Sequence, residues 1–278
     1  MAEREQYVLG HSQAEDERLR RQAEELEQES RWLLDRVGVR PGSRAVDVGC
    51  GPRGILDLLS ERVGPRGTVV GIERDGQSAS SARKFVEERQ LVNVEVMRGD
   101  AKATGLRRSS FDVVHARLVL VNVPEPERVV EEMVALVRPG GMVVSHEADF
   151  VPHLCDPPSA AWKRLFEVFE GYSRANGIDL FVGRRTHRMF RDAGIVDVQV
   201  RPLVHVYEPG HNRRTIFWDF MMNVRERVIA HGLVREPELS TLMAELKRHL
   251  EDPQTLVVSH LFFQVWGRKP AHRNPRAT

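Results

Sequence analysis

The stretch VDVGCGPRG, residues 46–54, joins a short apolar run to a segment with helical spacing. Its glycines allow a sharp backbone turn and let a ligand lie against bare main chain at the start of a helix. Asp47 lies at the end of the apolar run, at the edge where open α/β sheets bind ligands. A tight turn without a ligand is the alternative, and the position of Asp47 argues against it. The stretch therefore predicts the first strand and helix of an α/β sheet with a ligand site at the turn.

The segment around this turn, residues 45–147, alternates short apolar runs with helical patterns. The apolar runs predict strands at Ala45–Gly49, Thr68–Glu73, Val94–Arg98, Phe111–Ala116 and Met142–His146. Helical spacing is found between them, near 54–63, 77–90 and 125–137. Such alternation is typical of a parallel, doubly wound sheet that is covered by helices on both faces.

The segment before the sheet, residues 14–37, is predicted to form one long amphipathic helix. One face carries apolar or small residues at three- and four-residue steps, namely Leu19, Ala23, Leu26, Ser30, Leu33 and Val37. The helix either lies on its own domain or pairs with a second subunit in a homo-oligomer. The seven-residue spacing of Leu19, Leu26 and Leu33 permits the second arrangement.

The segment after residue 150 is predicted to contain helices over 151–193 and 215–250 and strands over 195–207 and 255–266. The tail, 270–278, is predicted to be disordered. We therefore divide the chain into an N-terminal segment, a cofactor-binding core, a helical insertion, and the last strands with a second insertion. These parts are 1–40, 41–150, 151–194 and 195–269, with the second insertion at 208–252.

Composition limits the function classes. The 41 Lys and Arg residues balance 40 Asp and Glu residues, so the chain lacks the basic excess of proteins that hold nucleic acid through its phosphates. No apolar run reaches the roughly 20 residues of a membrane span, and the first residues do not resemble a secretory signal. Two cysteines cannot form a disulfide framework. We expect a cytoplasmic protein that binds a small molecule, and neither nucleic acid nor a membrane.

Two features indicate a cofactor that contains adenosine. Gly49, Gly51 and Gly54 satisfy the pattern G-x-G-x-x-G, and Glu73 ends the second predicted strand. An acidic residue at that place can accept both ribose hydroxyls. These features do not choose between NAD and S-adenosylmethionine, so an NAD-dependent oxidoreductase is one alternative.

Four motifs, in order along the chain, carry a resemblance to a known family. They are RPGSRAVDVGCGPRG (40–54), VVGIER (69–74), GDA (99–101) and LVRPGGMVV (136–144). They resemble the motifs of class I S-adenosylmethionine-dependent methyltransferases. The opening YVLGHSQAEDERLRRQA (7–23) resembles the N-terminal segment of the small-molecule branch, with its actinomycete natural-product and quinone methyltransferases. The resemblance implies an enzyme with a Rossmann-like, doubly wound, seven-stranded sheet, helical lid insertions and S-adenosyl-L-methionine as cofactor.

The resemblance also implies which residues contact the cofactor. Asp47 would orient the methionine ammonium group, Glu73 would hold the ribose and Asp100 the adenine edge. Arg117 either meets the cofactor carboxylate or braces the helix that follows. The full expected set is Tyr7, Gln22, Asp47, Gly49, Cys50, Gly51, Glu73, Arg74, Gly99, Asp100, Ala101, His115 and Arg117. Arg53 departs from the family pattern, which usually has glycine there.

Methyl transfer from a sulfonium is an in-line displacement, so the protein mainly positions donor and acceptor. A base is needed only if the acceptor must lose a proton. Candidates at the end of the fifth predicted strand are His146, Glu147 and Asp149. His205 and His260, on apolar strands, are interpreted as structural. No metal site is expected.

Aromatic residues and methionines gather in the two insertions. This enrichment suits a hydrophobic or aromatic acceptor, although it also suits the ordinary core of a helical cap. The predicted acceptor pocket consists of Trp162, Phe166, Phe169, Phe181, Phe217, Trp218 and Met221. We expect methylation of oxygen, nitrogen or carbon on a small apolar molecule such as a secondary metabolite. Besides the oxidoreductase, a cofactor-binding protein or cyclase that has lost methyl transfer is an alternative.

Overall fold

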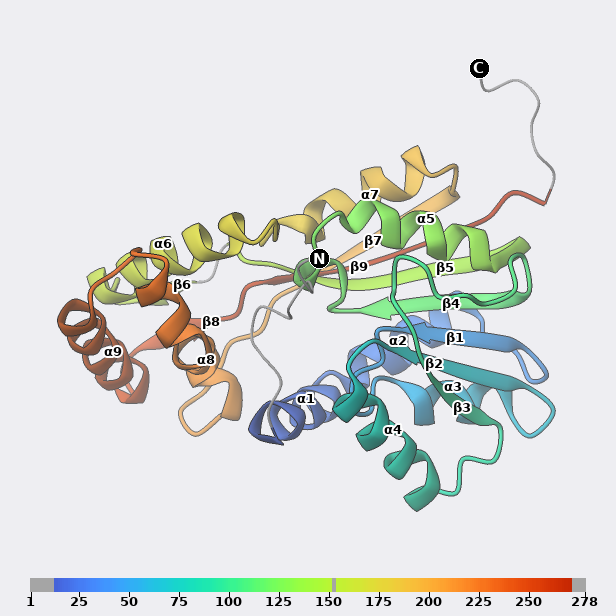
Figure 1. Cartoon of the computed structure of the whole chain (residues 1–278), viewed down its shortest axis with the longest axis horizontal. Helices are drawn as coiled ribbons and strands as arrows, with labels where there is room; N and C mark the ends of the chain where they lie inside the picture. Colours follow the sequence, from blue (N-terminus) through green and yellow to red (C-terminus); the bar gives the residue numbers. More distant parts are fainter. Residues whose placement is uncertain (1–12, 152–153, 272–278) are drawn as a thin grey trace.

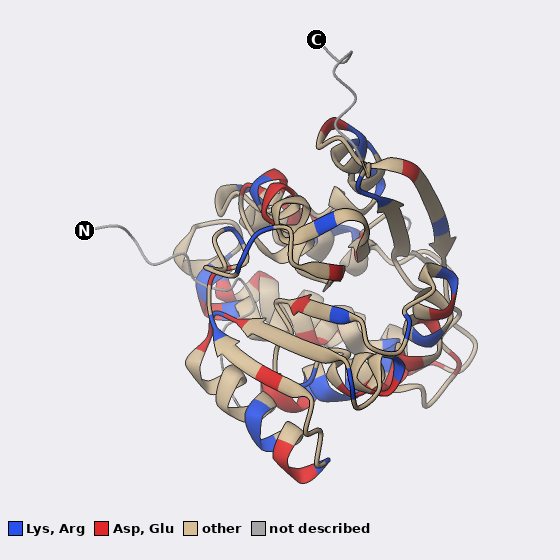
Figure 2. Cartoon of the chain, turned by 90° about the vertical axis from the view of Figure 1, so that its right-hand side faces the viewer, with Lys and Arg blue, Asp and Glu red and all other residues tan. Residues whose placement is uncertain are grey.

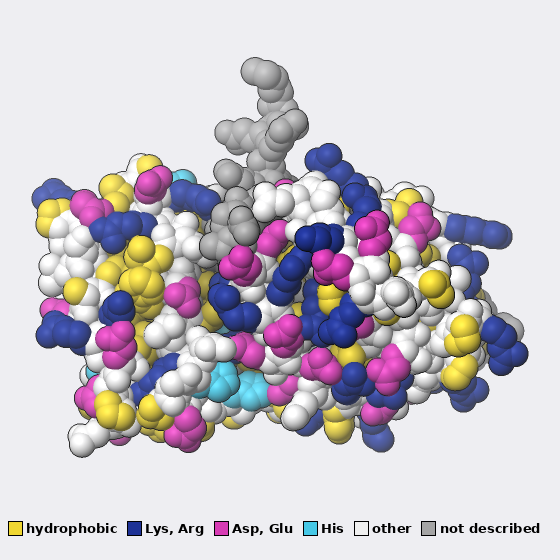
Figure 3. Space-filling view, turned by 90° about the horizontal axis from the view of Figure 1, so that it is seen from below, with side chains coloured by type: hydrophobic (Ala, Val, Ile, Leu, Met, Phe, Trp, Pro, Cys, Tyr) yellow, Lys and Arg dark blue, Asp and Glu magenta, His cyan; other side chains and the backbone are white. Residues whose placement is uncertain are grey.

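The computed structural model describes residues 13–151 and 154–271 (Figure 1). Tyr7 and nearly all of the tail predicted to be disordered lie outside these ranges. Acidic and basic residues are interspersed along the described ribbon (Figure 2). The face seen from below likewise alternates the two charges without a continuous basic surface (Figure 3).

A seven-stranded sheet forms the centre of the chain, in the order β3-β2-β1-β4-β5-β9-β7. Strands β1 to β5 run parallel, and β9 pairs antiparallel with both β5 and β7. The predicted α/β, doubly wound, seven-stranded fold is confirmed. Its strands are β1 (Arg44–Val48), β2 (Thr68–Glu73), β3 (Val94–Arg98), β4 (Phe111–Arg117), β5 (Val137–Asp149), β7 (Val196–Leu203) and β9 (Leu261–Arg268).

Two hydrophobic clusters cover the two faces of the sheet. Neighbouring residues on a strand enter opposite clusters, as Val113 and Val114 do, because successive side chains of a strand point to opposite faces. One cluster is completed by α3 (Leu56–Val63) and α4 (Gly76–Glu88). The other is completed by α5 (Pro126–Leu136) and α7 (Val182–Asp192).

The segment predicted to be one long helix is two helices, α1 (Gln13–Glu25) and α2 (Glu27–Val37). They are separated at Leu26, whose side chain enters the core. Periodicity alone does not reveal such a break, because Leu26 keeps its place on the apolar face. That face is buried against the chain's own sheet, from Ala23 to Val37, as in the first of the two expected arrangements.

A cap beyond the sheet is built from α6 (Ala160–Ala175), α8 (Ile216–Ala230), α9 (Glu236–Glu251) and a small sheet of β6 (Leu154–Asp156) and β8 (Leu256–Val258). Short turns of 3-10 helix lie at η1 (Leu120–Asn122) and η2 (Asn212–Thr215).

Two expectations for this region were wrong. Residues 151–193 are not helical throughout, because β6 precedes α6. The predicted strand 255–266 is divided into β8 and β9, which belong to different sheets. The division falls at Ser259, whose backbone N–H donates to His205 O and whose hydroxyl accepts from His205 N–H. An apolar run cannot show this change of sheet, since both halves have strand composition.

Arg214 holds the cap together from inside. Its guanidinium is buried and donates to four backbone carbonyls, at distances of 2.5–2.8 Å, on Tyr207, Leu250, Asp252 and Thr255. These carbonyls come from the end of α9, from the segment that follows it and, at Tyr207, from the segment between β7 and η2. Five donors on one planar group make this arrangement available to arginine and not to lysine.

Arg214→Lys should therefore lower the free energy of unfolding by about 3 kcal/mol, because an unpaired buried polar group costs about 1–3 kcal/mol and more than one carbonyl loses its donor. Denaturant titration measures the change. The exposed Arg191→Lys on α7 is the matched control. Equal shifts in the two variants would contradict the role of Arg214.

Candidate active site

A cavity of about 780 Å³ lies at the carboxyl ends of β1 to β4, between the sheet and the cap. Its core wall is polar and comes from the strand ends and α1, and its cap wall is mainly apolar. The core wall includes Asp16, Arg18, Leu19, Gln22, Asp47, Gly49, Cys50, Gly51, Glu73, Arg74, Gly99, Asp100, Ala101 and Arg117. The opposite wall, called the cap wall from here on, combines residues of α6 and α8 with residues that follow β4, end β5 or precede α7 and β9. It includes Val121, Val123, Ala148, Phe150, Phe169, Ile178, Leu180, Phe220 and His260.

The glycine loop between β1 and α3 requires its glycines for two physical reasons. Gly49 has φ +68°, and a Cβ there would lie 2.6 Å from Val119 Cγ2. Gly54 has φ +57°, and a Cβ there would clash with Asp47 Oδ2. Both the left-handed conformation and the lack of space exclude larger residues. Gly51 differs, because open space lies beside it in the cavity wall.

Asp47 connects the loop to the sheet. Its Oδ2 accepts the backbone N–H of Ile55 at 3.0 Å, at the start of α3, and its Oδ1 lies 2.7 Å from His115 Nδ1. Asp47 lines the cavity, whereas His115 lies behind it, buried on β4. His115 therefore supports Asp47 and does not itself contribute to the described cavity wall.

Carboxylates also end β2 and follow β3. Glu73 accepts from the backbone N–H of Gly51 at 2.9 Å and of Asp75 at 2.8 Å, and burial raises the pKa of its carboxyl. Asp100 accepts from the backbone N–H of Lys102 at 2.8 Å. Both side chains are thereby fixed at the cavity, next to open backbone at Gly51.

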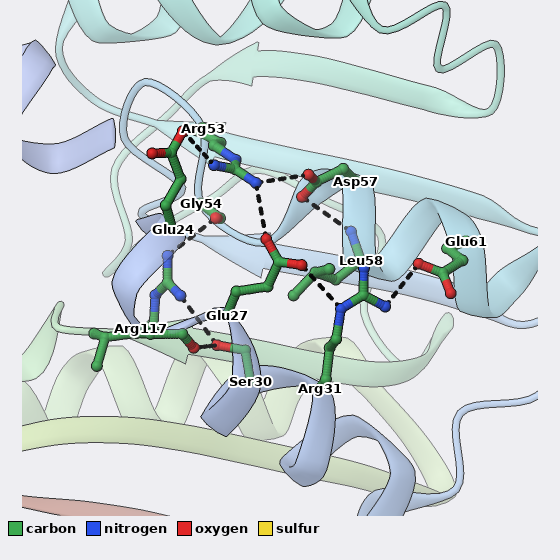
Figure 4. Close-up of polar contacts among 11 residues, drawn as sticks. Glu24, Glu27, Ser30, Arg31, Arg53, Gly54, Asp57, Leu58, Glu61 and Arg117 are labelled. Atoms are coloured by element: carbon green, nitrogen blue, oxygen red, sulfur yellow. Dashed lines mark hydrogen bonds and ion pairs between the residues drawn. The ribbon is translucent and has the colours of Figure 1, made fainter. Parts of the chain in front are cut away.

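Arg53 points toward the N-terminal helices (Figure 4). Its guanidinium forms ion pairs with Glu24 at 3.1 Å, with Glu27 at 3.3 Å and with Asp57 at 3.0 Å. The side chain is 7% exposed, and Arg53 is not among the cavity-lining residues. The departure from the family pattern is thus explained, because Arg53 ties the glycine loop to α1 and α2 while Gly54 makes the close turn.

Arg117, at the end of β4, lines the cavity and also braces the structure around it. It donates to Ser30 Oγ on α2 at 3.0 Å and to the carbonyl of Gly54 at 3.0 Å (Figure 4). Burial lowers the pKa of Arg117 to about 10, so the group stays charged at neutral pH. The position of Arg117 is therefore compatible with both predicted roles, contact with the cofactor carboxylate and support of the neighbouring structure.

The three predicted bases are not among the described residues that line the cavity. His146 is fully buried, and burial lowers its pKa well below the usual value. Asp149 forms a bidentate ion pair with Arg184, at 2.6 and 2.7 Å.

Glu147, the remaining candidate, accepts from the backbone N–H groups of Val119 and Val121 at 3.1 and 3.2 Å, and burial raises its pKa to about 7. It holds the segment after β4 that forms part of the cavity wall.

The predicted acceptor residues divide into three groups. Phe169 lines the cavity. Trp162 and Phe166 line an adjacent groove, which shares Phe150 with the cavity. The others do not line the cavity. Phe217 and Met221 are buried in the core of the cap, and the Trp218 indole donates to Met243 O. Phe181 lies outside the cap, directly before α7 and beside Arg184.

Sequence reasoning left out several residues of the cap wall, above all Phe150, Phe220 and His260. Phe150 could have been found from its position directly after the fifth strand. His260 carries no such signal, because it reaches the cavity only through the pairing of β9 with β5.

Helix α1 contributes Gln22 and Arg18, the two residues of this helix expected near the cofactor, and also Leu19. Its Asp16 accepts hydrogen bonds from Ser78 Oγ at 2.9 Å and Ser81 Oγ at 2.8 Å on α4. Within residues 13–151 and 154–271, no three His, Cys, Asp or Glu side chains are grouped for a metal ion. Over the same ranges, none of the helices has the length and hydrophobicity of a membrane span.

Comparison with known proteins gives a consistent result. A family model described as a methyltransferase domain matches residues 46–145. A demethylmenaquinone methyltransferase of Geobacillus sp. (strain WCH70) is 32% identical, over 66% of this chain and 86% of that protein. The chain belongs to the class I S-adenosylmethionine-dependent methyltransferases. It is an enzyme of this family that uses S-adenosylmethionine, and the oxidoreductase alternative is set aside.

Two further relatives match this methyltransferase over about half of their own length. An uncharacterized 37.1 kDa protein in transposon TN4556 of Streptomyces fradiae is 32% identical, over 63% of this chain and 50% of that protein. The solved structure of a phosphoethanolamine N-methyltransferase of Haemonchus contortus, in complex with S-adenosylhomocysteine, has a TM-score of 0.55 at 18% identity. The match covers 86% of this chain and 51% of the Haemonchus contortus chain, and it shows that the two share a fold.

Burial of Glu147 predicts a pH dependence of stability. Its pKa is raised to about 7 from a usual value of 4.5, so the folded chain keeps a proton there that the unfolded chain has lost. The contribution of Glu147 to the free energy of unfolding therefore falls as pH rises from 4.5 to about 7. Relative to Glu147→Gln, the wild-type free energy of unfolding should fall by about 3 kcal/mol between about pH 4.5 and pH 8.

Denaturant titrations at several pH values measure this difference. The exposed Glu131→Gln on α5 is the control and should show no such slope. A wild-type minus Glu147→Gln difference that stays constant with pH would show that Glu147 is ionised in the folded protein.

Proposed function

We propose that this methyltransferase methylates a planar aromatic acceptor of the hydroquinone class on a ring carbon. The observation that carries the proposal is an aromatic box in the cap wall, formed by Phe150, Phe169, Phe220 and His260. The rings of Phe169 and Phe220 are nearly parallel at 6.1 Å, and Phe150 lies 5.9 Å and 6.2 Å from them. Flat aromatic faces favour a flat, apolar acceptor.

The core wall fits S-adenosylmethionine. The Glu73 carboxylate suits the ribose hydroxyls, Asp100 the adenine edge, and Asp47 with Arg117 the charged methionine end. Gly51 leaves open backbone between them. Bound S-adenosylmethionine supplies an electrophilic methyl group. The chain's part is to hold the acceptor ring in the box, in line with that methyl, and to keep water away from it.

The relatives support the quinone assignment, since several are named demethylmenaquinone methyltransferases. Carbon methylation also suits the apolar cap wall, because a ring carbon needs no hydrogen-bond partner in the pocket. Cofactor binding without methyl transfer would favour the remaining alternative, a cofactor-binding protein or cyclase.

Glu73→Gln should raise the dissociation constant for S-adenosylhomocysteine by roughly 10-fold or more, because hydrogen bonds to a charged group contribute about 1.5–3 kcal/mol. Isothermal titration calorimetry measures it. Glu95→Gln, exposed on β3, is the control. Unchanged affinity in Glu73→Gln would remove the ribose assignment.

The acceptor assignment is tested with purified protein, S-adenosylmethionine and 1,4-dihydroxynaphthalene. We expect formation of S-adenosylhomocysteine together with a ring-methylated product, both followed by mass spectrometry. Phe169→Leu should raise the KM for the acceptor about 3- to 10-fold without weakening cofactor binding, since an aromatic contact is worth about 0.5–1.5 kcal/mol. Phe181→Leu, directly before α7 and outside the described cavity lining, should not. Cofactor binding without any methylated product would indicate the cyclase or binding-protein alternative.

A further inference from the structure

His260 lies in the cap wall immediately before β9 and is 2% exposed. Its ring stacks on Phe150 at 4.8 Å with an interplanar angle of 16°, and it packs against Phe262 at 4.5 Å. The hydroxyl of Ser259 donates to the backbone carbonyl of His260 at 2.6 Å. The imidazole is therefore held in one orientation, beside the aromatic box.

The other titratable groups of the cavity belong to the core wall. They are Asp16, Arg18, Asp47, Cys50, Glu73, Arg74, Asp75, Arg98, Asp100, Lys102 and Arg117. Among the described residues of the cap wall, His260 is the one side chain with an acid–base group. It thus lies on the side where the acceptor ring is proposed to bind, away from the groups assigned to the cofactor.

We propose that His260 is the general base of the methyl transfer, an inference that rests on the proposed function. A ring carbon of a hydroquinone becomes nucleophilic when the neighbouring hydroxyl loses its proton. The imidazole accepts that proton, and the O–H electron pair moves into the ring as the carbon–methyl bond forms. The sulfur–methyl electron pair remains on sulfur. The methylated carbon then releases its own hydrogen as a proton to water, and the C–H electron pair restores the aromatic ring. The imidazolium returns its proton to the ring oxygen, which gives the neutral product and regenerates His260.

Charged and titratable groups surround His260 from several elements. Arg18 of α1 lies over Phe220 at 5.3 Å, and Arg213 of η2 lies over Phe262 at 5.4 Å. His146 of β5 and His205 meet the same Phe262 ring at 5.5 and 5.7 Å. His205 does not line the cavity, so His205→Ala removes an equal imidazole from the same ring cluster and is a matched control.

The experiment compares His260→Ala, His260→Asn and His205→Ala with 1,4-dihydroxynaphthalene as acceptor. A general base contributes about 100- to 10,000-fold, so kcat should fall at least 100-fold in both His260 variants, with little change in S-adenosylhomocysteine affinity. The acidic limb of the wild-type pH profile should disappear. Added imidazole should restore activity to His260→Ala, since it can enter the space left beside Phe150. Activity within threefold of wild type, or a loss that imidazole does not restore, would overturn the proposal.

A second measurement does not depend on turnover. In the complex with S-adenosylhomocysteine, the ionisation of bound 4-nitrophenol is followed by its absorbance. Wild type and His205→Ala should bind the phenolate at lower pH than His260→Ala does. If this difference is found but no hydroquinone is methylated, His260 is supported as a proton acceptor and the proposed function is rejected. Methylation with no difference among the variants in either measurement would reject His260 and keep the proposed function.

Discussion

A buried carboxylate at the end of β1 is the constraint on which the site depends. Asp47 is 2% exposed, and burying a charge is costly unless it is paired or hydrogen-bonded. It meets this requirement by binding the N–H of Ile55, where α3 begins, and the imidazole of His115 on β4. Strand, loop and helix are thereby fixed to one another, and Gly54 is the residue that leaves space for the carboxylate.

The loop fixed in this way is then joined to its surroundings by charged side chains. Arg53 connects it to α1 and α2, and Arg117 connects it to α2 through Ser30 (Figure 4). The helix that precedes α2 lines the cavity, so the N-terminal segment is part of the site's wall and not an addition to it. The Asp16 contacts with Ser78 and Ser81 secure the same helix at its other side.

The acidic residues at the end of β5 show that a position at a strand end does not by itself give a residue a role in the reaction. Glu147 and Asp149 were candidates because strand ends carry reacting groups in this architecture. Their partners show instead that Glu147 orders the segment after β4 and Asp149 binds Arg184 near the start of α7. Both are taken up by structural contacts outside the described cavity lining, and the proton transfer that we propose falls to a residue from the far end of the chain.

Sequence alone determined the cofactor half of this protein. The glycine turn, Asp47, Glu73 and Asp100 are local in the chain, and each depends on its own strand end and on backbone conformations that only glycine adopts freely. The acceptor half was decided by tertiary structure. Only some of the aromatic residues of the cap line the cavity, and the composition of the cap does not indicate which ones do. Antiparallel pairing of Asp149 with Leu261 brings Phe150 next to His260, two residues that no local pattern connects, because strand register is set by long-range packing.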